Sequence, residues 1–188
     1  MTIALETERL VLRNFLVSDW EALHEIIALY AASEFAAYDQ PWPTTPDEIK
    51  QITEWFASGD SFLAACLKNM GQCIGLVVVN REPEVEAQVY NLGYVFHFGH
   101  HGKGYATEAC CALLDHAFIE LRAQRVVSGT AAVNRPSCRL LERLGFEMTG
   151  EGTTSFQETE DGDPVEFLGY TFTLTREQWT SRKSWQCC

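Results

Sequence analysis

A glycine-spaced junction between a strand pattern and a helix pattern constrains this chain more than any other feature of its sequence. Residues 89–98 form a long aromatic strand pattern that runs directly into the glycine-rich segment 99–104. Without Cβ atoms at Gly102 and Gly104 the backbone can turn sharply and present successive N–H groups to an anion, although glycine also begins helices for purely steric reasons. Apolar residues then recur at helical spacing, at Ala106, Ala109, Leu113, Ala117, Phe118 and Leu121. The junction therefore predicts a phosphate-binding turn at the start of a helix.

The other patterns predict a mixed α/β sheet with helices packed on its faces. Strands are expected at residues 10–15, 61–67, 73–80, 89–98 and 125–131, and two more on either side of a turn at 161–164. Helices are expected from a capping box at 18–21 to about residue 31, from Thr45 to Gly59, at 105–121 and at 134–144. At 188 residues the chain predicts a single domain, 1–188, with a core of about 5–174 and a short C-terminal tail.

The charge of the chain is strongly negative and unevenly distributed. Fourteen Lys and Arg against 26 Asp and Glu leave a formal charge of −12, which argues against nucleic acid or an anionic membrane as a partner. Residues 101–143 carry a net +2, and the rest of the chain carries −14. This split suits an anionic cofactor at one place and a cationic substrate at another, or it is a solvated acidic surface.

The cysteines and the absence of a secretory or membrane-spanning pattern favour a cytoplasmic protein. The seven cysteines are an odd number with no Cys-x-x-Cys spacing, as is typical of reduced thiols. No stretch approaches 18 consecutive apolar residues, and the N-terminus has no apolar core of a leader peptide.

Three segments resemble a known family. Residues 101–109 read HGKGYATEA, which resembles the acetyl-CoA-binding motif of the GCN5-related N-acetyltransferase (GNAT) superfamily, with His101 in place of the usual Arg or Gln. Residues 134–146 read NRPSCRLLERLGF and resemble the family's Asn-x-x-Ser helix, and residues 6–13 are similar to the start of the RimJ/RimL-like branch, which acetylates protein N-termini. The resemblance covers about residues 5–174.

The resemblance implies an acyl-CoA N-acyltransferase fold with a central splayed sheet, and acetyl-CoA as cofactor. The pantetheine arm of acetyl-CoA would lie between strands 95–98 and 125–131, and Asn134 would bind one of its amides or serve only as a helix cap. Arg139 would reach the anionic end of the cofactor or be an ordinary exposed residue. The cofactor-binding residues implied are Val95, Phe96, Phe98, His101, Gly102, Lys103, Gly104, Tyr105, Ala106, Thr107, Asn134 and Arg139.

The chemistry implied by the family needs an uncharged amine, stabilisation of the oxyanion and a proton for the departing thiolate. Many members supply this proton from a Tyr at the position that is Leu141 here, so Ser137 becomes the candidate, unless it only bonds back to the helix cap. The backbone N–H of Phe96 or His97 is the expected oxyanion donor. His97, Glu82, Glu158 and Glu160 are the candidates for the base, with His97 taken as the catalytic one.

Phe35, Tyr38 and Trp42 resemble the family's acceptor-side wall, and Glu158 and Glu160 are expected beside it. No metal is expected, because His97, His100 and His101 span a strand-to-loop transition without a spaced fourth ligand. The expected acceptor is a basic protein N-terminus, used by a monomer or homodimer. The alternatives are acetylation of a small cationic metabolite or antibiotic amine, and a non-catalytic acyl-CoA sensor.

Overall fold

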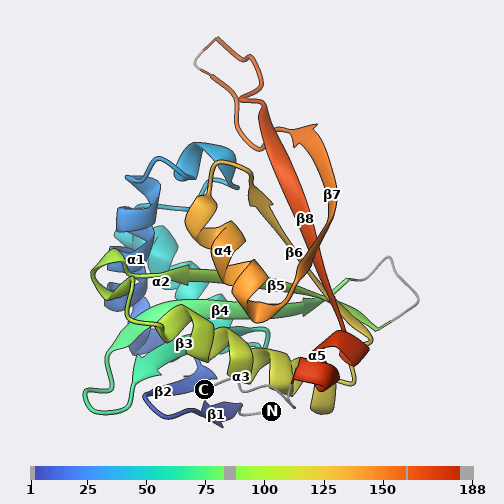
Figure 1. The fold of residues 1–188 in the computed structure, drawn as a ribbon. Helices are drawn as coiled ribbons and strands as arrows, with labels where there is room; N and C mark the ends of the chain where they lie inside the picture. Colours follow the sequence, from blue (N-terminus) through green and yellow to red (C-terminus); the bar gives the residue numbers. More distant parts are fainter. Residues whose placement is uncertain (1–2, 83–87, 160, 183–188) are drawn as a thin grey trace.

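The computed structural model describes residues 3–82, 88–159 and 161–182, and their strands form one sheet (Figure 1). Along the sheet the strands lie in the order β1-β2-β3-β4-β5-β6-β8-β7. All neighbours are antiparallel except β5 and β6, which are parallel. The strands are β1 (Ala4–Glu6), β2 (Leu10–Asn14), β3 (Phe62–Leu67), β4 (Cys73–Arg81), β5 (Val89–Phe96), β6 (Arg125–Ala131), β7 (Glu147–Thr154) and β8 (Phe167–Thr175). The predicted mixed α/β architecture is confirmed.

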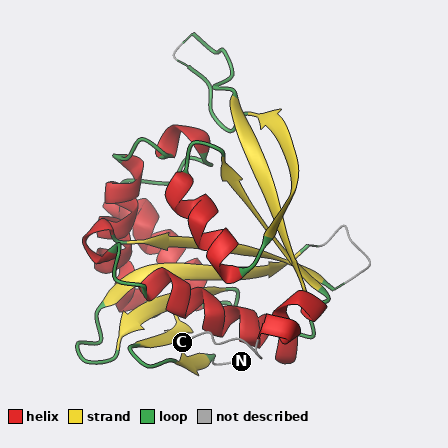
Figure 2. Cartoon of the chain, in the orientation of Figure 1, coloured by secondary structure: helices red, strands yellow, loops and turns green. Residues whose placement is uncertain are grey.

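Helices cover both faces of this sheet (Figure 2), and alternating side chains of the strands fill two cores. In β3, Leu63 and Ala65 belong to the core beneath α3 and α4, whereas Ala64 and Cys66 belong to the core beneath α1 and α2. Burial on both faces explains why this strand is a nearly continuous apolar run. The helices are α1 (Trp20–Ala31), α2 (Pro46–Ala57), α3 (Tyr105–Ile119), α4 (Arg135–Leu144) and α5 (Arg176–Arg182).

The capping box predicted from the sequence is present at the start of one helix and absent at another. At α2 the predicted capping box is confirmed, because Thr45 Oγ1 accepts from the Glu48 N–H and the Glu48 carboxylate accepts from the Thr45 N–H. At α1 the predicted box at 18–21 is wrong. Asp19 turns back instead, accepts from the Leu16 N–H at 2.8 Å and pairs with Arg13 at 2.6 Å, and a short 3-10 turn, η1 (Val17–Asp19), precedes the helix.

The sequence patterns missed β1 and α5, and both contribute to the packing around α3. The expected tail beyond residue 174 includes α5, which buries Trp179 against α3 and donates its indole N–H to the Asp115 carboxylate at 2.8 Å. Within the described ranges, none of the helices is both long and apolar enough to cross a membrane.

Candidate active site

A cleft opens where the two parallel strands of the sheet separate. Strands β5 and β6 are paired only from Val89 to Asn91, and Ser128 Oγ donates to the Leu92 carbonyl at 2.9 Å just beyond the last pair. From there the strands diverge (Figure 1). They line a cleft of about 1360 Å³ together with residues of α4 and of the start of α3. The divergence therefore begins at Asn91, before the 95–98 segment expected from the sequence.

The backbone of β5 presents free donors to this opening. The N–H of His97 donates to the Ile74 carbonyl of β4 at 2.9 Å, so it is not the oxyanion donor. Because N–H groups alternate between the two edges of a strand, the N–H of Phe96 points away from β4 and towards β6. Of the two expected oxyanion donors, only Phe96 faces the cleft.

The glycine loop forms the second wall. Gly102 and Gly104 have φ of +73° and +83°, in the left-handed region, and nothing lies within 4 Å of the place a Cβ would take at Gly102. The ring of His101 lies on that of Phe98 and its Nε2 lies 2.9 Å from the Phe96 carbonyl, which fixes the loop to the end of β5. The loop thus presents the unpaired N–H groups of the first turn of α3 to the cleft, as an anion site requires.

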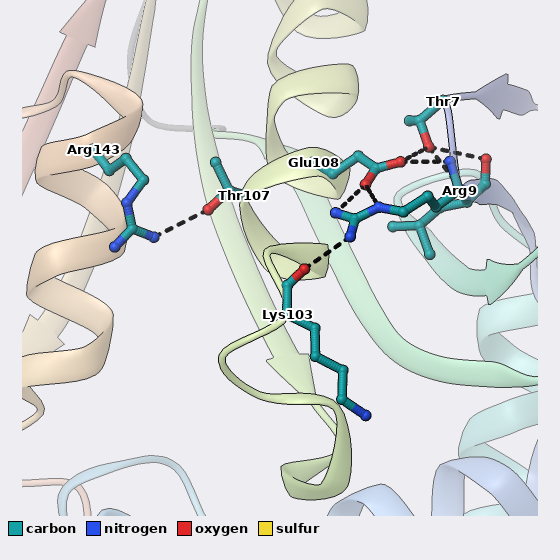
Figure 3. A network of polar contacts seen from close by, with 7 residues as sticks. Thr7, Arg9, Lys103, Thr107, Glu108 and Arg143 are labelled. Atoms are coloured by element: carbon teal, nitrogen blue, oxygen red, sulfur yellow. Dashed lines mark hydrogen bonds and ion pairs between the residues drawn. The ribbon is translucent and has the colours of Figure 1, made fainter. Parts of the chain in front are cut away.

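A brace from the connection between β1 and β2 holds this loop (Figure 3). Glu108, in the first turn of α3, accepts from Thr7 Oγ1 at 2.6 Å, from the Arg9 N–H at 2.7 Å and from Arg9 Nε at 2.7 Å. Arg9 also donates to the Lys103 carbonyl at 2.9 Å and lies over the ring of Tyr105. We call Thr7, Arg9 and Glu108 the Arg9 brace. It ties the loop to the sheet through residues about 100 positions away in the chain, and it gives a structural role to the 6–13 motif.

Ser137 meets a phenol that the sequence analysis did not include. Asn134 Oδ1 accepts from the Ser137 N–H at 3.2 Å as the cap of α4, and Ser137 Oγ lies 2.8 Å from the hydroxyl of Tyr94 on β5. Burial raises the pKa of Tyr94 well above its usual value. Leu141, at the position of the family's tyrosine, is fully buried in the core. The only sequence signal for Tyr94 is its place in the strand at 89–98, from which the sequence predicts cofactor contacts by backbone groups and not by this side chain.

A different arginine from the expected one faces the cofactor end. Arg139 is exposed and does not line the cleft, whereas Arg143, one helical turn later, lines it and donates to Thr107 Oγ1 at 3.2 Å (Figure 3). The expectation for Arg139 is therefore corrected in favour of Arg143. Lys103 does not line the cleft either, because its Nζ folds back onto the Gly99 carbonyl at 3.0 Å.

His97 makes structural contacts outside the cleft, whereas His100 lines the cleft. His97 does not line the cleft: its Nδ1 accepts from the Gly99 N–H at 3.0 Å, and its Nε2 lies 3.2 Å from Glu25, so both ring nitrogens are engaged and the geometry does not favour it as the base. His100 does line the cleft, and burial lowers its pKa, which favours the neutral ring. Among the described residues no group of three or more His, Cys, Asp or Glu side chains could hold a metal ion.

The opposite end of the cleft is aromatic and acidic. Phe35, Tyr38 and Trp42 line it as expected, and Tyr38 meets Phe167 of β8 edge-on at 5.5 Å. Gln157 Nε2 joins the two walls by donating to the carbonyls of Ala36 at 2.6 Å and Asp39 at 2.9 Å.

The carboxylates at this end are not those expected. Glu158 lies in a separate shallow hollow with Pro41 and Pro164, and Glu160 lies outside the described residues. Glu82 does not line the cleft. Instead, the carboxylates that line it are those of Glu34, Asp39 and Glu151, and Asp39 is held by the Tyr30 hydroxyl at 2.7 Å. The sequence predicts acidic residues beside the aromatic wall, but it indicates Glu158 and Glu160 and not the three carboxylates that line the cleft.

The contacts of Glu108 in the Arg9 brace should make the stability of the fold depend on pH. Hydrogen bonds from Thr7 and Arg9, together with the Arg9 charge, outweigh desolvation and lower the pKa of Glu108. A lowered pKa in the folded state stabilises the fold above the ordinary value of 4.5, and this stabilisation is lost as the pH falls through the lowered pKa. We expect Glu108→Gln to reduce the free energy of unfolding at pH 7, and the difference from the wild type to vanish in acid. Denaturant titrations from pH 7 to pH 3 measure this, with exposed Glu120→Gln as the matched control. A deficit that is independent of pH would contradict the ionic role of Glu108.

Comparisons with known proteins agree with this geometry. A family model described as "Acetyltransferase (GNAT) domain" matches residues 9–147. Two curated relatives are the uncharacterized N-acetyltransferase YnaD of Bacillus subtilis, 27% identical over 78% of this chain and 84% of that protein, and the uncharacterized N-acetyltransferase p20 of Bacillus licheniformis, 28% identical over 78% and 83%.

Solved structures share the fold over almost the whole chain. An acetyltransferase (GNAT family) from Bacillus anthracis has a TM-score of 0.78 at 23% identity, covering 93% of this chain and 99% of that one. The ribosomal-protein-S5-alanine acetyltransferase from Vibrio fischeri has a TM-score of 0.76 at 18% identity, covering 94% and 98%. With the diverging strands, the glycine loop and the family match together, this chain belongs to the GNAT family of acetyltransferases.

Proposed function

We propose that the cleft transfers the acetyl group of acetyl-CoA directly to a cationic primary amine, foremost a protein or peptide N-terminal α-amino group. The observation that carries the proposal is the polarity of the cleft. The glycine loop and Arg143 line one part of the cleft, and in another part Glu34 and Asp39 adjoin the aromatic residues Phe35 and Tyr38; Glu151 of β7 also lines the cleft. An anionic cofactor matches the first part and an amine matches the second.

The cofactor end fits acetyl-CoA, which would supply an activated acetyl thioester. The left-handed φ of Gly102 and Gly104 leaves room for a pyrophosphate against the N–H groups of residues 102–107, with Arg143 and Thr107 at the side. On the open edge of β5, the N–H groups of Tyr94 and Phe96 point away from β4 and can pair with an extended amide chain. Asn134 caps α4 with Oδ1, which leaves its Nδ2 free to donate to a ligand amide.

The reaction site lies where these walls meet. The Phe96 N–H faces the opening and would stabilise negative charge on the carbonyl oxygen of the thioester. Ser137 Oγ lines the same opening and would donate hydrogen to the departing sulfur. The acidic end would raise the local concentration of a cationic acceptor.

Two further observations support a protein N-terminus as the acceptor. The 6–13 motif resembles the RimJ/RimL-like branch, and the names of two structural neighbours, from Vibrio fischeri and Vibrio cholerae, identify ribosomal-protein acetyltransferases at 18% and 21% identity. A small cationic amine is the second candidate, favoured by the Gln157 link that joins the two walls at the acceptor end. A screen of N-terminal peptides, polyamines and aminoglycosides, read out as release of free CoA, distinguishes these acceptors. Binding of acetyl-CoA without turnover of any amine would leave only the sensor alternative.

Gly104→Val should abolish binding of acetyl-CoA. Valine strongly disfavours a backbone φ near +83°, and its side chain would lie beside Arg9 at the pyrophosphate site. A ligand at 100 times its Kd stabilises a protein by about 2.7 kcal/mol, and this rise should be missing in a thermal titration of the variant. Gly71→Val is the matched control, since Gly71 also has a positive φ of +67° but lies in the turn between β3 and β4. If the Gly104 variant binds as tightly as the wild type, the loop is not the phosphate site.

Ser137→Ala should lower kcat by about 100-fold with little change in the Kd of acetyl-CoA, because the hydroxyl acts on the leaving sulfur rather than on the bound cofactor. Steady-state rates and calorimetric binding measure the two quantities separately. A loss confined to Kd would make Ser137 a binding residue, and unchanged turnover would assign the hydrogen donor to water.

Neutralising the acceptor end should weaken steering of a cationic amine. We expect Asp39→Asn with Glu151→Gln to lower kcat/KM about tenfold at low salt and to flatten its decline between about 0.01 and 0.15 M salt, where the screening length falls from about 30 to about 8 Å. Glu158→Gln, in the separate hollow, is the control and should retain the wild-type salt dependence. Equal salt dependence in all three proteins would remove the argument for a cationic acceptor.

A further inference from the structure

The contact between Tyr94 and Ser137 is a buried pair of hydroxyl groups inside the proposed reaction site. Tyr94 lies on β5 beyond Asn91, the last residue paired with β6, and both Tyr94 and Ser137 line the cleft. The Tyr94 hydroxyl is 2.8 Å from Ser137 Oγ and 3.4 Å from the Ser137 carbonyl oxygen. Both polar contacts that the described residues give this phenol therefore come from Ser137.

The two distances favour the Tyr94 hydroxyl as the donor to Ser137 Oγ, because Oγ lies closer to the phenol than the Ser137 carbonyl oxygen does. A phenol carries one hydrogen, and both groups within its reach on Ser137 can accept it. Burial opposes ionisation of Tyr94, so the phenol keeps its hydrogen across the neutral range. A serine hydroxyl has one hydrogen and two lone pairs, and if one lone pair accepts from Tyr94, the Ser137 hydrogen is left free for another acceptor.

We infer that Tyr94 is a positioning residue that donates its hydroxyl hydrogen to Ser137 Oγ and thereby directs the Ser137 hydrogen towards the departing sulfur. This inference rests on the proposed function. As the bond between the amine nitrogen and the acetyl carbon forms, the carbon–sulfur bond breaks and its electron pair goes to sulfur. Ser137 gives its hydrogen to sulfur and takes the proton that the amine loses on its second lone pair. The step starts from the uncharged amine, after the cationic acceptor has given one proton to water. A second proton then leaves nitrogen as one joins sulfur, so the transfer balances.

Tyr94→Phe tests the inference because it removes only the hydroxyl. We expect kcat to fall about tenfold while the Kd of acetyl-CoA stays unchanged. The pKa of the CoA thiol in the enzyme–CoA complex, followed by ultraviolet absorbance of the thiolate as the pH is raised, should rise by about one unit in both Tyr94→Phe and Ser137→Ala. This second measurement needs no turnover.

Tyr90→Phe is the matched control. Tyr90 lies on the same strand and is not among the residues that line the cleft. Within the described part of the chain, its hydroxyl has one polar contact, with the Leu121 carbonyl at 3.5 Å. It should keep the wild-type kcat and the wild-type pKa of the bound thiol. Melting temperatures of both phenylalanine variants check that each remains folded at the assay temperature.

The double variant separates the two proposals. If Tyr94 acts through Ser137, then Tyr94→Phe with Ser137→Ala should be no slower than Ser137→Ala alone. Additive losses, or a Tyr94→Phe variant with wild-type kcat and thiol pKa beside an impaired Ser137→Ala, would overturn the role of Tyr94 and leave that of Ser137 standing. Unimpaired Ser137→Ala with normal binding of acetyl-CoA would overturn both roles while leaving the cofactor site intact.

Discussion

The architecture depends on the parting of two parallel strands. β5 and β6 share only three paired positions, and beyond Asn91 their facing edges lack a partner strand. Backbone N–H and C=O groups left without partners are costly unless water or a ligand satisfies them, so an open edge inside a sheet is a strong sign of a binding site. The side chain of Ser128 satisfies the Leu92 carbonyl at the point of separation, and the ring of His101 contacts the Phe96 carbonyl. Among the described residues, the N–H groups of Tyr94 and Phe96 then remain for an extended ligand.

The glycine loop can serve this cleft only because distant residues hold it. A loop with two positive φ angles is flexible in isolation, since glycine has more backbone freedom than any other residue. The Arg9 brace limits that freedom with hydrogen bonds from the connection between β1 and β2 to Glu108 and to the Lys103 carbonyl. A preformed loop loses less entropy when an anion binds, so the brace would contribute to affinity for the proposed cofactor without touching it.

The electrostatics of the molecule follow the same division. Residues 101–143 carry a net +2, and of the Lys, Arg, Asp and Glu residues in this segment only Arg143 lines the cleft, beside Thr107. The carboxylates of Glu34, Asp39 and Glu151 line the same cleft. A single cavity therefore offers both signs of charge, which would suit the proposed reaction between an anionic donor and a cationic acceptor.

Local patterns in the sequence determined most of the strands and helices, the glycine loop, and the caps at Thr45 and Asn134, because each of these depends on neighbours within a few residues. The motifs that resemble the GNAT superfamily predicted the splayed sheet and the cofactor that it would bind. Contacts between distant segments decided the rest: that Arg143 and not Arg139 faces Thr107, that His97 is engaged by Glu25, and that Asp39 lines the cleft while Glu158 does not. Residues one helical turn apart share a face but are displaced by about 5.4 Å along the axis, and one step along a strand reverses the side chain. Spacing alone does not determine which of them meets a distant segment. Tyr94 meets Ser137 only because α4 packs beside the opening in the sheet, which is a property of the tertiary structure.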